Sequence, residues 1–380
     1  MPIRKGSVTL TKQFEKMTDP RVARTRLHSL ADVIVIAILG TICGAEYWED
    51  LPRFGNAKLE WLKKYLELPN GIPSADTFCR VFQRLDPDEF MKCMSHWVSR
   101  LREESGEKIV DIDGQTLRGS AFGGCRPLHL VRAWASENRL VLGQIVCEEK
   151  SNEITAIPNL LKLIEIKGAI VTIDAMGTQT EIAKTIRERK ADYVLPVKGN
   201  QPKLEAAVQA AFDLEMERQE PGQRTPLRYH RTFEIHAGRE EERLYYIMPV
   251  PKDMPGAERW KDLKSIGMVI RRRVVQGVEE LHVQYYITSL PARVKRFARA
   301  VRGHWSIENK LHWMLDVNFG QDASTTRKGH SPEIASMLRQ LALTLLTHCP
   351  DLKGSIKGRR KIAGWNNGVL EQILAHFIGI

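Results

Sequence analysis

The segment from residue 168 to residue 201 constrains the fold most, because it predicts a parallel β-α-β unit. An apolar run at residues 170–173 ends in Asp174, a helical pattern covers residues 180–189, and a second apolar run follows at residues 193–197. Strand, crossover helix and strand in this order are typical of parallel pairing. An acid at the carboxyl end of such a strand lies where α/β sheets place their chemistry. Asp174 is therefore a candidate catalytic residue, although a turn-forming aspartate explains this segment alone equally well.

The preceding segment predicts three antiparallel strands and one helix. The strands cover residues 109–113, 129–135 and 140–148, with a hairpin turn at residues 137–138, and the helix covers residues 154–166. The order β-β-β-α-β-α-β is that of a ribonuclease-H-like mixed sheet, in which the first and fourth strands are neighbours. Asp113 closes the first strand as Asp174 closes the fourth, so two carboxylates that are distant in sequence are expected to meet. Asp111 points to the same strand face and is the alternative to Asp113.

The rest of the chain predicts helices around this sheet and a β-rich insertion within the domain. Residues 1–104 are expected to form an N-terminal helical domain, with helices at residues 28–44, 57–66, 74–85 and 88–102 and Ser74 as a helix N-cap. Residues 105–380 are expected to form the α/β domain. Its insertion at about residues 203–291 contains a helix at residues 204–217 and strands at 229–236, 242–250, 267–275 and 281–290, which predict a small sheet of its own. Helices resume after residue 292, the last of them at residues 332–347.

The charge of the chain favours a polyanionic partner. Lys and Arg number 57 against 46 Asp and Glu, so the formal net charge is +11. Such a balance suits nucleic acid, although many basic proteins bind none. The longest apolar run, residues 33–45, is too short to span a membrane, and the first residues lack the apolar core of a signal peptide. The six scattered cysteines show no metal-binding spacing. We therefore expect a cytoplasmic, nucleoid-associated protein with reduced thiols.

A third acid is predicted on the helix around residue 308. His304, Glu308, His312 and Asp316 follow one another at intervals of one helical turn and form a drifting polar stripe. Glu308 is the candidate that completes a three-carboxylate site, and Asp316 is its alternative. Oxygen ligands of this kind favour Mg²⁺ or Mn²⁺. Two such ions about 3.5–4 Å apart would clamp the attacking and leaving oxygens of an in-line phosphoryl displacement.

Long motifs in this chain resemble those of a known enzyme family. They are DGQTLRGS at 113–120, EKSNEITAIPNLL at 149–161, TIDAMGTQ at 172–179, DYVLPVKGNQ at 192–201 and RGHWSIENKLHWMLDV at 302–317. Together with RLHSLADVIVIAILGTICGAEYWEDLPRFG at 26–55, they resemble ISAs1-type insertion-sequence transposases, a group of IS4-like DDE transposases that includes the H-repeat-associated proteins. The resemblance covers nearly the whole chain.

The resemblance implies a function and a set of catalytic residues. It implies a DNA transposase with a ribonuclease-H-like core, with Asp113, Asp174 and Glu308 as catalytic and metal-binding residues and the use of two Mg²⁺ or Mn²⁺ ions. The implied partners are the DNA ends of the element and its target DNA, and active molecules are expected to pair as a homodimer on DNA, with no membrane involved. Two alternatives remain open: a DNA-binding protein of the same family without catalysis, and a plain hydrolytic nuclease.

Some positions depart from the wider group. A Tyr-Arg-Glu-Lys signature commonly surrounds the last acid there, whereas this chain has Val301, His304 and Leu315 in place of Tyr, Arg and Lys. Gln115 stands where a lysine is common, and Ile334 where an asparagine is common. Trp305 and Trp313 are expected to pack under their helix, with stacking on bases as the alternative. Candidate nucleic-acid contacts are Arg118, Lys198, Asn200, Gln201, Arg302 and His304.

Overall fold

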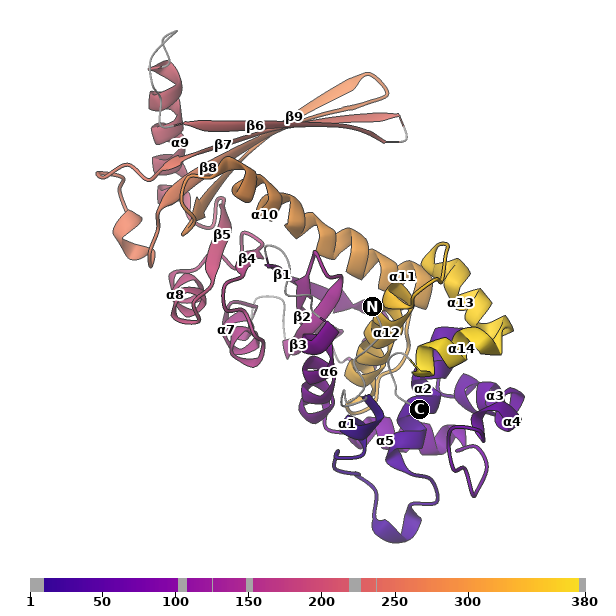
Figure 1. Ribbon diagram of the computed structural model, residues 1–380. Coiled ribbons are helices and arrows are strands. Elements are labelled where there is room, and N and C mark those ends of the chain that lie inside the picture. Colours follow the sequence, from indigo (N-terminus) through magenta and orange to yellow (C-terminus); the bar gives the residue numbers. More distant parts are fainter. Residues whose placement is uncertain are drawn as a thin grey trace.

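One sheet of nine strands runs through the computed structural model, which describes residues 10–101, 108–124, 126–147, 153–218, 227–236 and 238–375. The strand order is β3-β2-β1-β4-β5-β9-β8-β7-β6 (Figure 1). The strands are β1 (Ile109–Leu117), β2 (Leu128–Ala135), β3 (Leu140–Cys147), β4 (Ile170–Ile173), β5 (Asp192–Val197), β6 (Arg228–His236), β7 (Arg239–Pro249), β8 (Ser265–Val275) and β9 (Val278–Thr288). The predicted domain boundary at residues 104–105 and strand end at residue 148 lie outside the described residues.

The first five strands have the predicted ribonuclease-H-like arrangement. β1 pairs antiparallel with β2 and parallel with β4, and β4 pairs parallel with β5. The crossover helices are α7 (Glu153–Leu163) and α8 (Thr180–Glu188). The adjacency of the first and fourth strands is thus confirmed. β1 is longer than predicted, because its pairing with β2 continues to Leu117 opposite Leu128.

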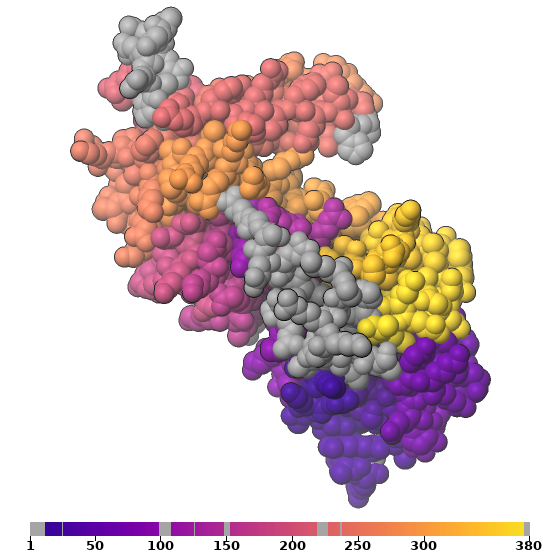
Figure 2. All heavy atoms as spheres, viewed as in Figure 1, coloured from indigo at the N-terminus to yellow at the C-terminus, as the bar shows by residue number. Residues whose placement is uncertain are grey.

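The expectation that the insertion forms a separate sheet is wrong. β9 pairs antiparallel with β5, from Val194 opposite Thr288 to Val197 opposite Tyr285. An unpaired β5 would expose a row of backbone N–H and C=O groups, and β9 satisfies them by extending the sheet. α9 (Pro202–Glu217) packs on β9, where the Phe212 and Tyr285 ring centroids lie 6.2 Å apart. The strands β6–β9 therefore form an arm that projects from the central sheet (Figures 1 and 2).

A long helical segment connects the arm to the rest of the molecule. It consists of α10 (Val294–Ile307), a π-helical turn η5 (Glu308–His312) and α11 (Trp313–Phe319). α10 packs across the sheet, and its buried Phe297 contacts Tyr245 and Tyr286 edge-on. Gly267 of β8 lies under the Phe297 ring, where any Cβ would clash with it. This packing fixes α10 against both the arm and the central strands (Figure 1).

The N-terminal helices share their hydrophobic core with the C-terminal part of the chain. These helices are α1 (Leu10–Phe14), α2 (Leu30–Cys43), α3 (Asp50–Ala57), α4 (Leu59–Leu62), α5 (Ala75–Arg84) and α6 (Pro87–Leu101). α2 packs on α12 (Ser331–His348); α2 is apolar nearly all round, and both helices are largely buried. One continuous cluster runs from Phe14 to Leu374. The last helices, α13 (Ile356–Trp365) and α14 (Asn367–Ile373), complete this body (Figure 1).

The helix predicted at residues 57–66 is mostly wrong, whereas the Ser74 cap is confirmed. The segment divides into α3 and α4 at Lys58, whose backbone is not helical. Ser74 precedes α5, and its hydroxyl accepts a hydrogen bond from the Thr77 N–H at 3.3 Å. Among the helices in the described part of the chain, none has the length and apolarity needed to cross a membrane.

Candidate active site

Asp113 lies where the parallel pairing of β1 and β4 ends. Ile112 and Ile173 are the last paired residues of these strands, so Asp113 and Asp174 follow at the same edge of the sheet. Asp113 is mostly buried, and its Oδ1 accepts a hydrogen bond from the Gly114 N–H at 2.9 Å. Burial raises the pKa of Asp113 to about 7, and the negative charges of Asp174, Glu308 and Glu153 contribute to the increase. The three carboxylates predicted from the sequence are thus electrostatic neighbours.

Asp111, the alternative to Asp113, is fully buried and already hydrogen-bonded. Ser136 donates to its Oδ2 at 2.5 Å, and Thr172 on β4 donates to its Oδ1 at 2.6 Å. Burial raises the pKa of Asp111 to about 6. Because both oxygens are engaged by hydroxyl groups of the protein, Asp111 ties β1 to its neighbours. This geometry favours Asp113 over Asp111 as the reactive carboxylate.

The loop after Asp174 is held by the loop that follows β5. The Asn200 side chain donates to the Ala175 carbonyl at 2.5 Å, and the Gln201 side chain donates to the Thr178 carbonyl at 3.1 Å. Within the loop, the Gly177 N–H donates to Asp174 Oδ1 at 3.1 Å. The amides that the sequence marks as candidate DNA contacts are therefore engaged with the protein backbone, where they order the loop that carries Asp174.

Glu308 begins the π-helical turn, which interrupts the regular spacing predicted for this helix. A π turn adds a residue to the helical repeat and is frequent at functional sites. Glu308 is exposed, whereas His312 is buried, with its Nδ1 3.5 Å from Asp113 Oδ2. Burial keeps the pKa of His312 well below its usual range, so this imidazole is neutral at neutral pH. His312 contacts Asp113 without supplying a positive charge.

Asp316, the alternative to Glu308, belongs to a buried polar network. Gln115 donates to Asp316 Oδ2 at 2.9 Å, and Arg132 donates to Gln115 Oε1 at 2.5 Å. Arg132 also donates to Ser336 on α12 at 2.9 Å. Burial raises the pKa of Asp316. The guanidinium of Arg132 on β2 thus lies next to Gln115. Ile334 is buried within the same α12 helix.

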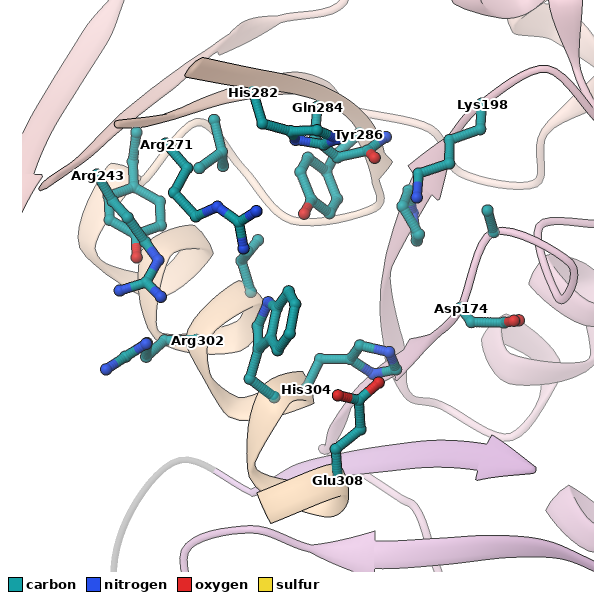
Figure 3. A pocket seen from close by; sticks show the side chains of 16 residues that line it. Asp174, Lys198, Arg243, Arg271, His282, Gln284, Tyr286, Arg302, His304 and Glu308 are labelled. Atoms are coloured by element: carbon teal, nitrogen blue, oxygen red, sulfur yellow. The ribbon is translucent and has the colours of Figure 1, made fainter. Parts of the chain in front are cut away.

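A pocket of about 290 Å³ opens between this acidic edge and the arm. Figure 3 shows Arg243, Arg271 and Arg302 on one side of the pocket, across from Asp174 and Glu308. Its other lining residues with polar atoms in their side chains are Lys198, Tyr245, His282, Gln284, Tyr286, His304 and Trp305. The three arginines thus lie across the cavity from Asp174, whereas Lys198 lies on the Asp174 side. A phosphate chain that approached the acids could contact the cations at the same time.

Two of these arginines were missed by sequence reasoning. Arg243 on β7 and Arg271 on β8 are register partners, so their side chains project side by side from the same sheet face. Burial and the charge of Arg302 lower the pKa of Arg243. Alternation along each strand marks which residues share a face. The alternation does not show that this face is directed toward the acids, because the orientation of the arm depends on the pairing of β9 with β5.

The remaining candidate DNA contacts have different environments. Lys198 is exposed at the pocket, and Arg302 lines it while forming an ion pair with Glu234. Burial lowers the pKa of His304 to about 4, so it is a neutral hydrogen-bonding group, with Nδ1 3.1 Å from the Thr172 hydroxyl. Arg118 is absent from the pocket lining; its side chain is 84% exposed and lies 3.6 Å from Asp322. The structure therefore brings three of the six candidates, Lys198, Arg302 and His304, into the pocket.

The expectation that Trp305 and Trp313 pack under their helix is wrong. Their exposed fractions are 42% and 54%. Trp305 lines the pocket, with the Arg271 guanidinium 5.7 Å from its ring centroid. The side of the helix that packs is occupied by Ile307 and Leu311, both fully buried. Trp305 is consequently available to a ligand in the pocket.

The acidic cluster has the donor chemistry of a divalent cation site. Its oxygens are those that Mg²⁺ and Mn²⁺ prefer. Burial raises the pKa of Asp113, and a bound cation would offset the neighbouring negative charges that add to the increase. The buried Nε2 of His312 beside it has no hydrogen-bond partner. Within the described ranges, however, no group of three or more His, Cys, Asp or Glu side chains is arranged to hold a metal ion. The donor types therefore fit a cation, and the carboxylates are neighbours without forming a closed ligand shell.

Comparisons with known proteins find similar sequences for both the N-terminal helical part and the rest of the chain. Residues 11–98 match the family described as DDE_Tnp_1-associated, and residues 104–345 match the family described as Transposase DDE domain. "Putative transposase YncI" of Escherichia coli O157:H7 is 41% identical over 354 residues, which cover 92% of this chain and 90% of that protein. "H repeat-associated putative transposase YhhI" of E. coli K12 is 37% identical over 358 residues, covering 92% and 93%.

Among solved structures, the piggyBac transposase synaptic complex with hairpin DNA is similar at a TM-score of 0.44. It is 10% identical in sequence, and the match covers 97% of this chain and 78% of that chain. This likeness is too distant to support an argument about individual residues. The shorter relative "Inactive transposase YbfQ" of E. coli K12 is 44% identical over 63 residues, which are 17% of this chain.

Proposed function

This chain belongs to the transposase DDE family, and we propose that it cleaves DNA at the ends of an insertion sequence and joins the freed 3′-hydroxyl groups to target DNA. We assign the chemistry to Asp113, Asp174 and Glu308. The observation that supports this assignment is that Asp113 and Asp174 directly follow the last paired residues of β1 and β4, at one edge of the sheet. Asp113 carries a pKa of about 7 because it is buried beside the other two acids. Clusters that perturb pKa values in this way are concentrated at catalytic sites.

The family generally uses divalent metal ions, and we propose Mg²⁺ or Mn²⁺, with two ions at the site. Asp113, Asp174 and Glu308 would hold them through carboxylate oxygens. Bound ions of this kind activate an attacking oxygen and stabilise a leaving oxygen in phosphoryl transfer. The protein's own contribution is to bring the three acids from β1, the β4 loop and the π turn to one edge of the sheet. The hydrogen bonds from Asn200 and Gln201 keep the Asp174 loop ordered for this purpose.

We propose that the basic side chains of the pocket hold the DNA backbone while the acids act on it. Arg243, Arg271, Arg302 and Lys198 would contact phosphates, and these contacts fix the register of the strand without reading its sequence. Neutral His304 is limited to hydrogen bonding, because burial lowers its pKa to about 4. DNA is thus the proposed partner of the arm and of the acidic edge together. An exposed Trp305 could add stacking on a base.

The assembly and location of the protein follow from the proposed reaction. Two element ends must be brought together before they are joined, so we propose a homodimer on DNA, acting in the cytoplasm on the nucleoid. We retain the proposed division into an N-terminal helical domain of residues 1–104 and a catalytic domain of residues 105–380. The shared core of α2 and α12 indicates that the two parts act as one body.

The test is a cleavage and joining assay with the DNA that flanks this reading frame. Purified protein, Mg²⁺ and labelled fragments that carry the flanking inverted repeats should yield nicked ends and products joined to a target plasmid. Asp174→Asn should abolish both products and leave DNA binding largely intact. Undiminished cleavage by this variant would refute the catalytic role assigned to Asp174. Nicked ends without any joined product would favour a hydrolytic nuclease, and tight binding without cleavage would favour a non-catalytic DNA-binding protein.

A further inference from the structure

A buried histidine–glutamate pair lies behind the strand that carries Asp113. His129 Nε2 and Glu153 Oε1 are hydrogen-bonded at 2.6 Å, and the two side chains are only 3% and 4% exposed. The other ring nitrogen of His129 is 2.8 Å from the Thr116 hydroxyl on β1. The pair therefore links the first turn of α7 to β2 and β1. The proposed reaction assigns no role to this pair.

The pair can lie close to the acidic edge because Gly114 has no side chain. A Cβ at Gly114 would lie 2.7 Å from His129 Nε2 and closer still to Glu153 Oε1. The φ of Gly114 is negative, so the glycine is required by space and not by backbone conformation. Glu153 thus lies against the residue that directly follows Asp113.

We propose that Glu153 is a fourth acidic residue of the site, which strengthens divalent-cation binding by Asp113 through its charge and without contacting the cation. This inference rests on the proposed function. A negative charge that is shielded from water acts over several ångströms, because the surrounding protein has a lower effective dielectric constant than water. Gly114 allows the approach of Glu153, because it has no side chain. The simpler explanation is that the pair only ties α7 to the sheet.

Mn²⁺ binding by the full-length chain, measured by electron paramagnetic resonance without DNA, separates these explanations. Glu153→Gln keeps the size of the side chain and removes its charge, so the Mn²⁺ dissociation constant should rise about tenfold, which corresponds to about 1.4 kcal/mol. Glu153→Asp keeps the charge and should stay within about threefold of the wild type, a difference of under 1 kcal/mol. His129→Asn breaks the same hydrogen bond but leaves the charge, so Mn²⁺ binding should not weaken. Glu181→Gln, the same change at an exposed first-turn glutamate of α8, is the matched control and should have no effect.

Two results would overturn the proposal. One is unchanged Mn²⁺ affinity in folded Glu153→Gln. The other is equal loss of affinity in Glu153→Asp and His129→Asn, which would indicate a structural tie only. If Glu153→Gln does not fold, Glu153→Asp and His129→Asn decide between a charge effect and a purely structural role. Asp113→Asn is measured in parallel: if it binds Mn²⁺ like the wild type, the proposed cation site fails. If Asp113→Asn loses Mn²⁺ binding and Glu153→Gln does not, the cation site stands and only the proposed role of Glu153 is refuted.

Discussion

Replacing Asp113 with asparagine should stabilise the metal-free protein, although it removes a proposed catalytic group. Asp113 has a pKa of about 7 in the folded chain, against an ordinary value of 3.8. The difference is about three pKa units, and each unit corresponds to 1.36 kcal/mol. Ionised Asp113 therefore costs the fold about 4 kcal/mol, which partial exposure and screening reduce to about 2–4 kcal/mol. Asparagine has nearly the same shape and carries no charge, so this cost disappears.

The stabilisation should depend on pH with a definite sign. At pH values below 3.8 the carboxyl is protonated in both the folded and the unfolded chain, so the variant gains nothing. Between 3.8 and about 7 the unfolded chain releases this proton while the folded chain retains it, so the free energy of unfolding of the wild type falls. Above about pH 7 the full difference between the two proteins is present. A saturating divalent cation should reverse the order, because it binds the folded wild type preferentially.

Urea denaturation in the presence of a chelator, followed by tryptophan fluorescence at pH 5, 6, 7 and 8, measures this difference. The urea midpoint of Asp113→Asn should exceed that of the wild type by an amount that grows with pH. Asp76→Asn, at an aspartate that is 80% exposed and paired with Arg80, is the control and should shift the midpoint only slightly, by an amount that does not change with pH between 5 and 8. A variant that is less stable than the wild type at pH 8, or equally displaced at all pH values, would refute the reasoning.

Three further predictions follow from the packing and the charges. Arg132→Met should lower the free energy of unfolding by about 3–5 kcal/mol in urea titrations, because it leaves Gln115, Ser336 and the Asp316 charge without their buried partner. Arg271→Ala should weaken binding to all DNA sequences and reduce the slope of log affinity against log salt by about 1, whereas Arg231→Ala on the opposite face of the arm should not. A chain that begins at residue 108 should fail to fold by circular dichroism, because α12 would lose the buried face of α2; a soluble, cooperatively melting fragment would contradict this.

Much of the central fold could be predicted because it depends on local patterns. The apolar runs of β4 and β5 and the helix between them specify a parallel unit, and the order of elements then determines that β1 lies beside β4. This adjacency is enough to bring Asp113 and Asp174 together. Ser74 could be recognised as a cap for the same reason, since capping depends on residues within one turn.

The errors concern contacts between segments that are distant in sequence. No local pattern shows that β9 pairs with β5, so neither the continuous sheet nor the position of Arg243 and Arg271 could be predicted. The π turn at Glu308 was also missed, because a regular helix and a helix with one wide turn have nearly the same sequence pattern. That turn separates exposed Glu308 from buried His312, which regular spacing would place on one stripe.

The central claim is that three distant segments form one divalent-cation site, and iron-directed backbone cleavage tests it most directly. Fe²⁺ replaces Mg²⁺ in the purified chain, and ascorbate with hydrogen peroxide then generates hydroxyl radicals at the bound ion, which cut the nearby backbone. The proposed site predicts cuts near Asp113, Asp174 and Glu308, suppressed together by excess Mg²⁺ and lost together in Asp113→Asn. Cuts confined to one of these segments, or three cuts that persist in Asp113→Asn, would contradict a shared site.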